Sequence, residues 1–285
     1  MCLSCILLCW SSYELCGIRY EYNKAEQEYE AIRDAVKNSA PKGGEVDVTE
    51  SPMESTGASM SQCYADSLGL SSLDMSQYET AGTIMGLPGI PLNYLIAVRY
   101  NLVDFDKLQQ INPEVVGWIT IEGTNIDYPV LHSQESNEYY LRKTITGEFN
   151  NAGSIFVDYK VETPFSCENT IIHGHNQRNK TMFHELSYYE DKEFFNSHRH
   201  ILIYLPSKEC VTYEIYSFYI SPSVSVTYDC SYIGTEYQLY LDYTMEQSWY
   251  DTGVKLTMED KIITLSTCTN GWEDERYVVH ARKIS

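Results

Sequence analysis

The feature that constrains the fold most is a series of short apolar runs between residues 104 and 285. These runs are rich in β-branched and aromatic residues, which favour strands. Gly, Asn, Pro and Ser separate them, and this spacing is typical of a β-barrel or a β-sandwich. The runs are VVGWITIEG, IDYPVLH, GSIFVDY, NTIIHGH, HILIYLP, VTYEIYSFYI, KIITLSTC and RYVVHARKI. The sequence therefore predicts a closed, mainly β domain over residues 104–285.

Three segments of this domain have a helical rather than a strand pattern. DFDKLQQINP predicts a short helix that breaks at Asn112-Pro113, because proline ends a helix. NKTMFHELSYYEDKEFFNSH predicts two short helical turns. The segment from Thr235 to Gly253 has no internal glycine, and a glycine at its end is typical of a helix C-cap. We expect one long helix there, just before the strand that carries Cys268.

The N-terminal part of the chain predicts three further units. Residues 1–18 begin with an apolar run, but Glu14 follows it and no basic residue precedes Arg19. A spanning helix needs about 20 mostly apolar residues, and a signal peptide needs a basic start, so neither pattern is complete. We interpret this segment as a membrane anchor, complete or truncated, with a frayed hydrophobic end as the alternative.

The next two units differ in composition. Residues 19–37 are rich in Glu, Lys and Ala and predict an exposed helix, with Tyr22, Ala25, Tyr29 and Ile32 along one face. Residues 38–103 begin with a stretch rich in Ser, Gly, Pro and Glu that has no apolar period. This composition predicts an acidic, flexible linker.

Charge and cysteine content exclude several classes of protein. Forty acidic and twenty basic residues give a net charge of −20, which argues against nucleic acid because phosphate binding needs a basic surface. The nine cysteines are odd in number, with one CxxC pair (Cys2 and Cys5, inside the N-terminal apolar run) and no zinc-finger spacing. At least one thiol is therefore free, and no disulfide framework is indicated.

Cys268 stands out because it ends the β-branched run IITLST and precedes a polar loop. A residue at the end of a barrel strand is held rigidly yet faces the rim, which suits a nucleophile. A hairpin through residues 269–275 would return Arg276 close to Cys268, where a guanidinium favours a thiolate or an oxyanion. A buried structural thiol, and a surface ion pair of Arg276 with Glu273 or Asp274, are the alternatives.

The histidines supply candidates for a base. A free thiol is mostly protonated at neutral pH, so cysteine chemistry needs an imidazole partner. His175 follows the run NTII, at a strand–loop junction like that of Cys268. His173-x-His175 could also seat a metal ion, but no third ligand stands at a familiar spacing, so we expect no metal and no cofactor. We interpret His132 and His280 as ordinary strand histidines.

These segments together resemble a class B sortase, a cell-wall-sorting cysteine transpeptidase of Gram-positive bacteria. The matching segments are NPEVVGWITIEGTNIDYPVL, NEYYL, AGSIFVDYK, NTIIHGHN, KTMF, ITLSTC and ERYVVHARKI, in this order. The resemblance implies a closed eight-stranded sortase-type β-barrel with N-terminal helices, and a long helix before the strand that carries Cys268. It also implies an enzyme tethered to the cell membrane by a single N-terminal anchor, with an extracytoplasmic catalytic domain.

The resemblance further implies a role for each matching position. Cys268 would be the nucleophile, His175 the general acid and base, and Arg276 the group that stabilises the oxyanion. The substrate would be a surface protein with an NPQTN-like C-terminal sorting signal, cleaved after its Thr through a thioester and transferred to an amino group of a peptidoglycan precursor. The residues implied in substrate binding are Ser266, Thr267, Asn137, Leu141 and His173.

Three alternatives differ from this interpretation. An L,D-transpeptidase or an NlpC/P60-type peptidase would carry its cysteine in another context or ahead of its histidine. A pilin-polymerising sortase would share the chemistry but use another amine. A catalytically idle surface module would share only the barrel. Cleavage of a sorting peptide that depends on Cys268 separates a sortase from the last alternative.

Overall fold

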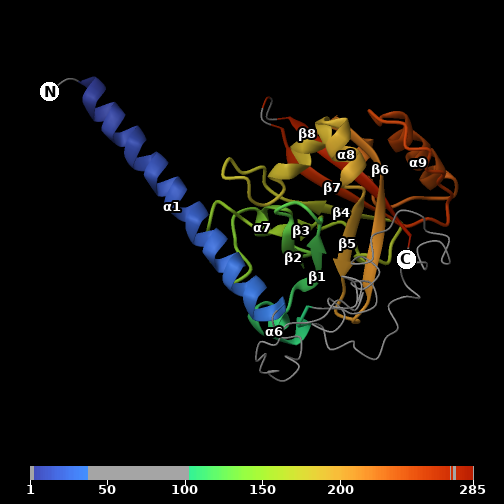
Figure 1. The fold of residues 1–285 in the computed structure, drawn as a ribbon, viewed down its shortest axis with the longest axis horizontal. Helices are drawn as coiled ribbons and strands as arrows, with labels where there is room; N and C mark the ends of the chain where they lie inside the picture. The colour runs from blue at the N-terminus through green and yellow to red at the C-terminus, as the bar shows by residue number, and fades with distance from the viewer. Residues whose placement is uncertain (1–2, 38–102, 270, 272–273, 285) are drawn as a thin grey trace, which may run out of the picture.

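The β-strands of the domain close into an eight-stranded barrel, in the order β1-β2-β3-β4-β7-β8-β6-β5 (Figure 1). The computed structural model describes residues 3–37, 103–269, 271 and 274–284. The predicted linker therefore lies outside the described residues, apart from Val103. The strands are β1 (Val115–Thr120), β2 (Asp127–His132), β3 (Ile155–Val157), β4 (Asn169–His173), β5 (His200–Tyr204), β6 (Cys210–Pro222), β7 (Ile262–Cys268) and β8 (Glu275–Lys283). Each of the eight apolar runs forms one strand, so the predicted closed barrel is confirmed.

Two pairs of neighbouring strands are parallel, and the others are antiparallel. β2 pairs with β3 in parallel, and β4 pairs with β7 in parallel, from Asn169 opposite Ile262 to His173 opposite Ser266. Parallel strands end at the same edge of a sheet and need a long connection. Between β4 and β7 this connection contains β5, β6 and the helices that follow them. The ends of β4 and β7 therefore meet, although they are far apart in the sequence.

β7 is a central strand that is covered on both faces. Six of its seven residues are buried, and Cys268 at its end is exposed. Its inward side chains belong to the barrel core, with Ile263 and Leu265 both fully buried. On the outer face Ile262 packs with Tyr216, Tyr240 and other residues in a second apolar cluster. Burial on both faces explains why β7 is a continuous β-branched run rather than an alternating one.

Short helices connect the strands, and most follow the sequence patterns. α6 (Phe105–Ile111) begins at Asp104, whose side chain accepts from Lys107 N, and it ends at Asn112. The two predicted helical turns are η1 (His184–Glu190) and α8 (Lys192–Ser197). α7 (Glu138–Leu141) and η2 (Val226–Tyr228) are shorter still.

The long helix predicted between Thr235 and Gly253 is shorter than expected. α9 spans Glu236–Glu246 and covers the outer face beside β6 (Figure 1). Beyond it, Trp249 N donates to Phe218 O at 2.9 Å, and the Trp249 ring meets the Phe218 ring edge to face. The backbone thus bonds to β6 instead of continuing the helix, and Gly253 (φ +66°) lies in the following loop. Gly253 is therefore not the helix C-cap.

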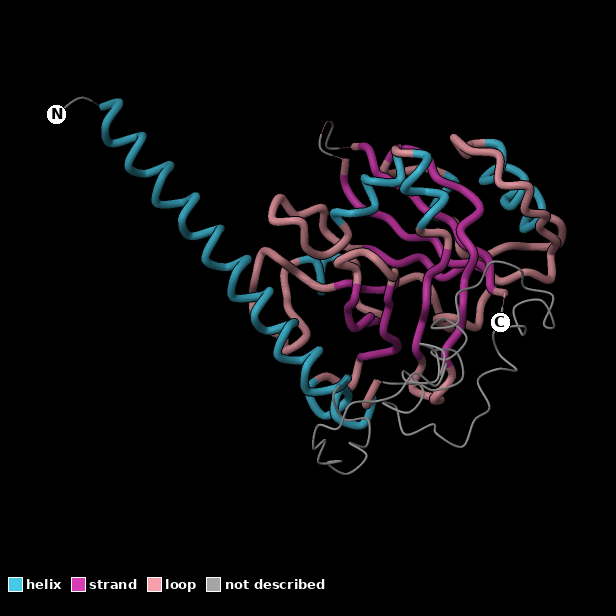
Figure 2. The backbone as a smooth tube through the Cα atoms, in the orientation of Figure 1, coloured by secondary structure: helices cyan, strands magenta, loops and turns pink. Residues whose placement is uncertain are grey.

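The N-terminal helix α1 (Leu3–Lys37) is longer than the helix predicted at 19–37, and its C-terminal half packs against the barrel (Figure 2). The residues buried there are Ala25, Tyr29, Ile32 and Val36. The expectation of an exposed helix is therefore wrong for this face, because its apolar residues recur at helical spacing and cover the barrel. Within the described residues, no helix has both the length and the apolar character that crossing a membrane requires.

Candidate active site

A cleft of about 300 Å³ opens where β4, β7 and β8 meet. All eight site residues predicted from the sequence line it: Cys268, His175, Arg276, Ser266, Thr267, Asn137, Leu141 and His173. They come from the strand ends, from α7 and from the segment after β4. The fold thus brings together residues that are widely separated along the chain.

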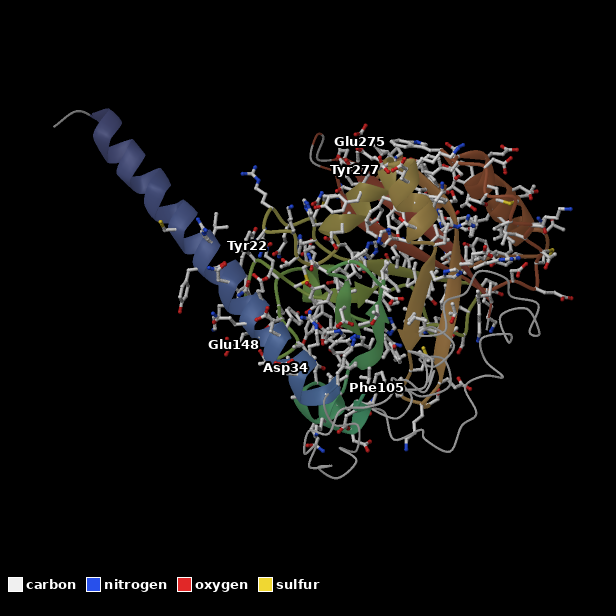
Figure 3. The ribbon with its side chains drawn as sticks, viewed as in Figure 1. Tyr22, Asp34, Phe105, Glu148, Glu275 and Tyr277 are labelled. Atoms are coloured by element: carbon white, nitrogen blue, oxygen red, sulfur yellow. The ribbon has the colours of Figure 1, made fainter. Side chains whose placement is uncertain are left out.

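Cys268 and Arg276 face each other across the β7–β8 hairpin. They are a direct antiparallel pair in the register of the two strands, as the sequence predicts. Cys268 is an exposed, free thiol, so the alternative of a buried structural cysteine is wrong. Arg276 is half-buried, and its Nη1 donates to Glu275 O at 2.9 Å. Figure 3 labels Glu275 and Tyr277, which flank Arg276 at the start of β8.

His175 lies two residues beyond the end of β4, as Cys268 lies two residues beyond Ser266 on β7. The parallel register pairs His173 with Ser266, and Gly174 N donates to Ser266 O at 3.2 Å. The next residue, Asn176, donates from Nδ2 to Cys268 O at 2.8 Å. This bond fixes the segment carrying His175 to the residue that carries the thiol.

The imidazole of His175 is oriented by one hydrogen bond. Its Nε2 lies 2.7 Å from Leu141 O. A carbonyl oxygen only accepts, so Nε2 carries the proton in this tautomer. Nδ1 has no hydrogen bond to a described residue and is the nitrogen that remains for proton exchange. Burial lowers the pKa of His175 below 6.5, outweighing the Leu141 carbonyl, which raises it.

A buried carboxylate, which the sequence interpretation missed, forms one wall of the cleft. Asp158 Oδ2 accepts from His173 Nε2 at 2.9 Å and from Asn137 Nδ2 at 2.8 Å. Burial raises the pKa of Asp158, but its hydrogen bonds prevail and bring the pKa to about 2. An ionised Asp158 requires a proton on His173 Nε2, so Nδ1 of a neutral His173 ring is an acceptor. The signal in the sequence is weak, since Asp158 only ends the run SIFV.

Tyr228 adds a further polar group to the cleft lining, beside the predicted Ser266 and Thr267. Tyr228 Oη lies 3.0 Å from Ser266 Oγ, and the Tyr228 ring stacks on His173. Burial raises the pKa of Tyr228 to about 12, against opposing effects of Ser266 and Arg276. Thr267 Oγ1 is buried without a hydrogen-bond partner among the described residues.

His280 and His132 do not line the cleft. His280 is fully buried on β8, between Tyr219 Oη at 2.9 Å and Thr264 Oγ1 at 2.9 Å, and burial lowers its pKa to about 3. His132 ends β2 and is not part of the cleft lining. In the described part of the chain, no group of three or more His, Cys, Asp and Glu side chains is placed to hold a metal ion.

Comparison with known proteins agrees with this fold. A model of the sortase domain matches residues 119–284. Sortase B of Listeria monocytogenes is 38% identical over 186 residues, which cover 62% of this chain and 73% of that protein. Sortase B of Staphylococcus aureus is 34% identical over 188 residues, covering 63% and 74%. The X-ray structure of Clostridium perfringens sortase B matches with a TM-score of 0.60 at 32% identity, covering 64% of this chain and 100% of that chain. The chain therefore belongs to the sortase family, and its similarity to these relatives assigns it to the class B sortases.

Proposed function

We propose that this sortase cleaves an NPQTN-like C-terminal sorting signal after its Thr and transfers the protein to an amino group of a peptidoglycan precursor. Sortases are transpeptidases that act on surface proteins bearing sorting signals, and the relatives support this activity for the chain. The observation that carries the proposal is the arrangement of Cys268, His175 and Arg276 in one cleft. A thiol, an imidazole and a guanidinium supply the three functions that acyl transfer needs.

In the proposed first half-reaction, the Cys268 thiol passes its proton to His175 Nδ1. The thiolate then attacks the carbonyl carbon of the substrate Thr and forms a C–S bond. The peptide C–N bond breaks, and His175 returns the proton to the departing amine. The Nε2–H bond to Leu141 O supports this role, because it leaves Nδ1 available while it holds the ring in place.

In the second half-reaction, the acceptor amine attacks the thioester carbonyl. His175 takes the proton from the attacking nitrogen, the C–S bond breaks, and the released Cys268 thiolate regains a proton. In both half-reactions a negative charge develops on the carbonyl oxygen. Arg276 stands directly across from Cys268 in the strand register, so its guanidinium is suited to stabilise that charge.

The substrate peptide would lie along the wall formed by Asn137, Leu141, His173, Ser266 and Thr267, which all line the cleft. His173 is held by Asp158, so its Nδ1 offers an acceptor in the neutral ring. Carboxamide side chains, as in an NPQTN-like peptide, donate N–H groups and would match such an acceptor. This complementarity supports a polar rather than a purely apolar sorting signal.

A fluorogenic NPQTN-like peptide tests the reaction. We expect the full chain to cleave it after Thr, and mass spectrometry to detect an acyl-enzyme on Cys268 when no amine is added. Cys268→Ala and His175→Ala should lose turnover, whereas Arg276→Lys should retain part of it because the charge remains. Equal cleavage by the wild type and Cys268→Ala would overturn the nucleophile assignment.

The acceptor is tested by adding amines to the same assay. Peptidoglycan stem-peptide amines should accelerate release of the acyl group and appear in the product. Faster release by the lysine of a pilin-type peptide would favour a pilin-polymerising sortase, the alternative that shares this chemistry. An absence of acyl-enzyme with any sorting peptide would favour a non-catalytic surface module.

We propose a location at the cell membrane, through the N-terminal segment, with the catalytic domain outside. Sortases are cell-surface enzymes, which supports the location of the domain. Fractionation of cells that express the full chain, and a chain beginning at residue 19, tests the anchor. Equal recovery of both chains in the soluble fraction would refute it.

A further inference from the structure

Helix α1 contacts the Gly153–Ser154 segment, which lies against His175, and it contacts Tyr128, which binds the segment after His175. Four of its side chains are buried against the barrel: Ala25, Tyr29, Ile32 and Val36. Figure 3 labels Tyr22 on this helix and Glu148 on the neighbouring loop, where Lys24 Nζ lies 2.7 Å from Glu148 Oε2. This ion pair is exposed, so it contributes little to the contact. The buried contacts are therefore the ones that can influence the cleft.

Tyr29 makes the buried polar contact between the helix and the barrel. It is 2% exposed, and its hydroxyl donates to Gly153 O at 2.9 Å. The same hydroxyl lies 3.0 Å from Ser154 Oγ, which donates to Lys143 O. Burial raises the pKa of Tyr29, so the phenol keeps its proton and remains a donor. Tyr29 thus holds the Gly153–Ser154 peptide from outside the barrel.

Gly153 in turn lies against the groups that orient His175. A Cβ at this position would lie 2.5 Å from Leu141 O and 3.0 Å from His175 Cδ2, and φ is +61°. Ser154 N also donates to Tyr140 O at 3.1 Å, which ties the two segments together. Since Leu141 O accepts from His175 Nε2, a displacement of Gly153 would move both the acceptor and the ring.

A second connection from Tyr29 reaches the segment after His175. The Tyr29 ring meets the Tyr128 ring edge to face, with centroids 5.5 Å apart. Tyr128 Oη accepts from Met182 N at 3.2 Å, and Met182 pairs with Asn176 as an isolated β-bridge. Lys180 and Met182 both have φ values in the left-handed region, at 67° and 57°. Such a backbone persists only where surrounding contacts fix it.

We propose that Tyr29 is a positioning residue that, through Gly153 and Leu141 O, fixes the ring orientation and the tautomer of His175. Helix α1 is then part of the catalytic unit and not only a tether. This inference rests on the proposed role of His175 as the acid and base. Without the hydroxyl, the Gly153 peptide shifts, the bond to Leu141 O weakens, and the proton is no longer confined to Nε2.

Tyr29→Phe tests the proposal because it removes the hydroxyl and keeps the ring contact with Tyr128. We expect about tenfold lower kcat/KM with the sorting peptide, since a small misplacement of a catalytic group costs up to ~10²-fold. The loss should fall on kcat, because Tyr29 does not line the cleft. Tyr22→Phe is the matched control on the same helix, because the Tyr22 hydroxyl has no hydrogen bond to a described residue, and it should behave as the wild type.

A spectroscopic measurement separates positioning from stability. We expect ¹⁵N NMR of His175 to show the Nε2–H tautomer in the wild type and a mixture of tautomers in Tyr29→Phe. A wild-type tautomer and an unchanged kcat in Tyr29→Phe, with only a lower Tm, would overturn the proposal. If Tyr29→Phe does not fold, Gly153→Ala displaces the same peptide and perturbs the same link to His175, because a Cβ there would lie 2.5 Å from Leu141 O. Wild-type spectra and kcat in that variant would then overturn it.

The proposed function can fail separately. If the wild type cleaves no sorting peptide and Cys268 forms no acyl-enzyme, the transpeptidase proposal fails. The NMR comparison of wild type, Tyr29→Phe and Tyr22→Phe still decides the positioning role, because it requires no substrate. Loss of the Nε2–H signal in Tyr29→Phe, but not in Tyr22→Phe, supports the link from α1 to His175.

Discussion

Replacement of Asp158 by Asn removes the buried charge that organises one wall of the cleft. The Asp158 side chain is 7% exposed. It accepts from His173 Nε2 at 2.9 Å, from Asn137 Nδ2 at 2.8 Å and from Lys160 N at 3.0 Å. Burial alone would raise the pKa of this carboxyl, but the three donors prevail and lower it from 3.8 to about 2. The ionised form is therefore favoured in the folded state.

The size of the effect follows from linkage between protonation and folding. A carboxyl with a lowered folded-state pKa stabilises the protein above its unfolded pKa, and this stabilisation is lost as the pH falls through the folded value. A shift from 3.8 to about 2 corresponds to about 2 kcal/mol at pH 7 and about 1 kcal/mol at pH 3. Asn imitates the protonated acid, so Asp158→Asn should lower the free energy of unfolding by these amounts.

Urea unfolding at pH 7 and pH 3 measures the difference between the two proteins. Glu138→Gln is the matched control, because Glu138 lines the same cleft, is exposed and makes no side-chain hydrogen bond to a described residue. It should change the free energy of unfolding by less than about 0.5 kcal/mol. An Asp158→Asn protein as stable as the wild type at pH 7, or a loss of equal size at both pH values, would refute the reasoning.

Three further predictions concern other parts of the molecule. Asp127→Ala should lower the free energy of unfolding, measured by urea titration, by about 3 kcal/mol, because the Trp118 indole N–H and two cations of α1 lose their acceptor. A loss below about 1 kcal/mol would contradict this. In the proposed mechanism the neutral ring of His175 accepts the thiol proton, so peptide cleavage should stay active below pH 6.5, because burial lowers the pKa of His175. An acid limb of kcat/KM above pH 6.5 would argue against this. Gly174→Ala should lower the free energy of unfolding by about 1–3 kcal/mol, because a Cβ would lie 2.8 Å from the Phe183 ring. An unchanged Tm would show that the ring moves away freely.

The strands, and the exposed position of Cys268 at the end of one of them, could be predicted because their signals are local. The run before Cys268 is β-branched throughout, which indicates a strand buried on both faces, and the structure buries six of its seven residues. β7 and β8 are adjacent in the sequence and are joined by a short polar loop. This is enough to predict a hairpin in which Arg276 returns to Cys268. The register then pairs the two residues.

Other parts depend on contacts that no local pattern encodes. Asp158 is one of forty acidic residues, and only the fold shows that His173 and Asn137 converge on it. The end of α9 depends on the hydrogen bond from Trp249 N to Phe218 O, which competes with further helical bonds. The burial of α1 likewise requires the barrel surface, since its apolar face alone is also compatible with an exposed helix.

The meeting of His175 with Cys268 depends on one feature of strand order, the parallel pairing of β4 with β7. If β7 paired with β4 in the antiparallel sense, the two strands would end at opposite edges of the barrel. The parallel register aligns His173 with Ser266, so the residues two positions further on emerge side by side at one rim. The antiparallel partner β8 starts at that same rim and brings Arg276 there. A strand with a parallel neighbour on one side and an antiparallel neighbour on the other thus brings the distant His175 beside Cys268 and the nearby Arg276. Resemblance could therefore propose His175 from the sequence, but only the fold could locate it.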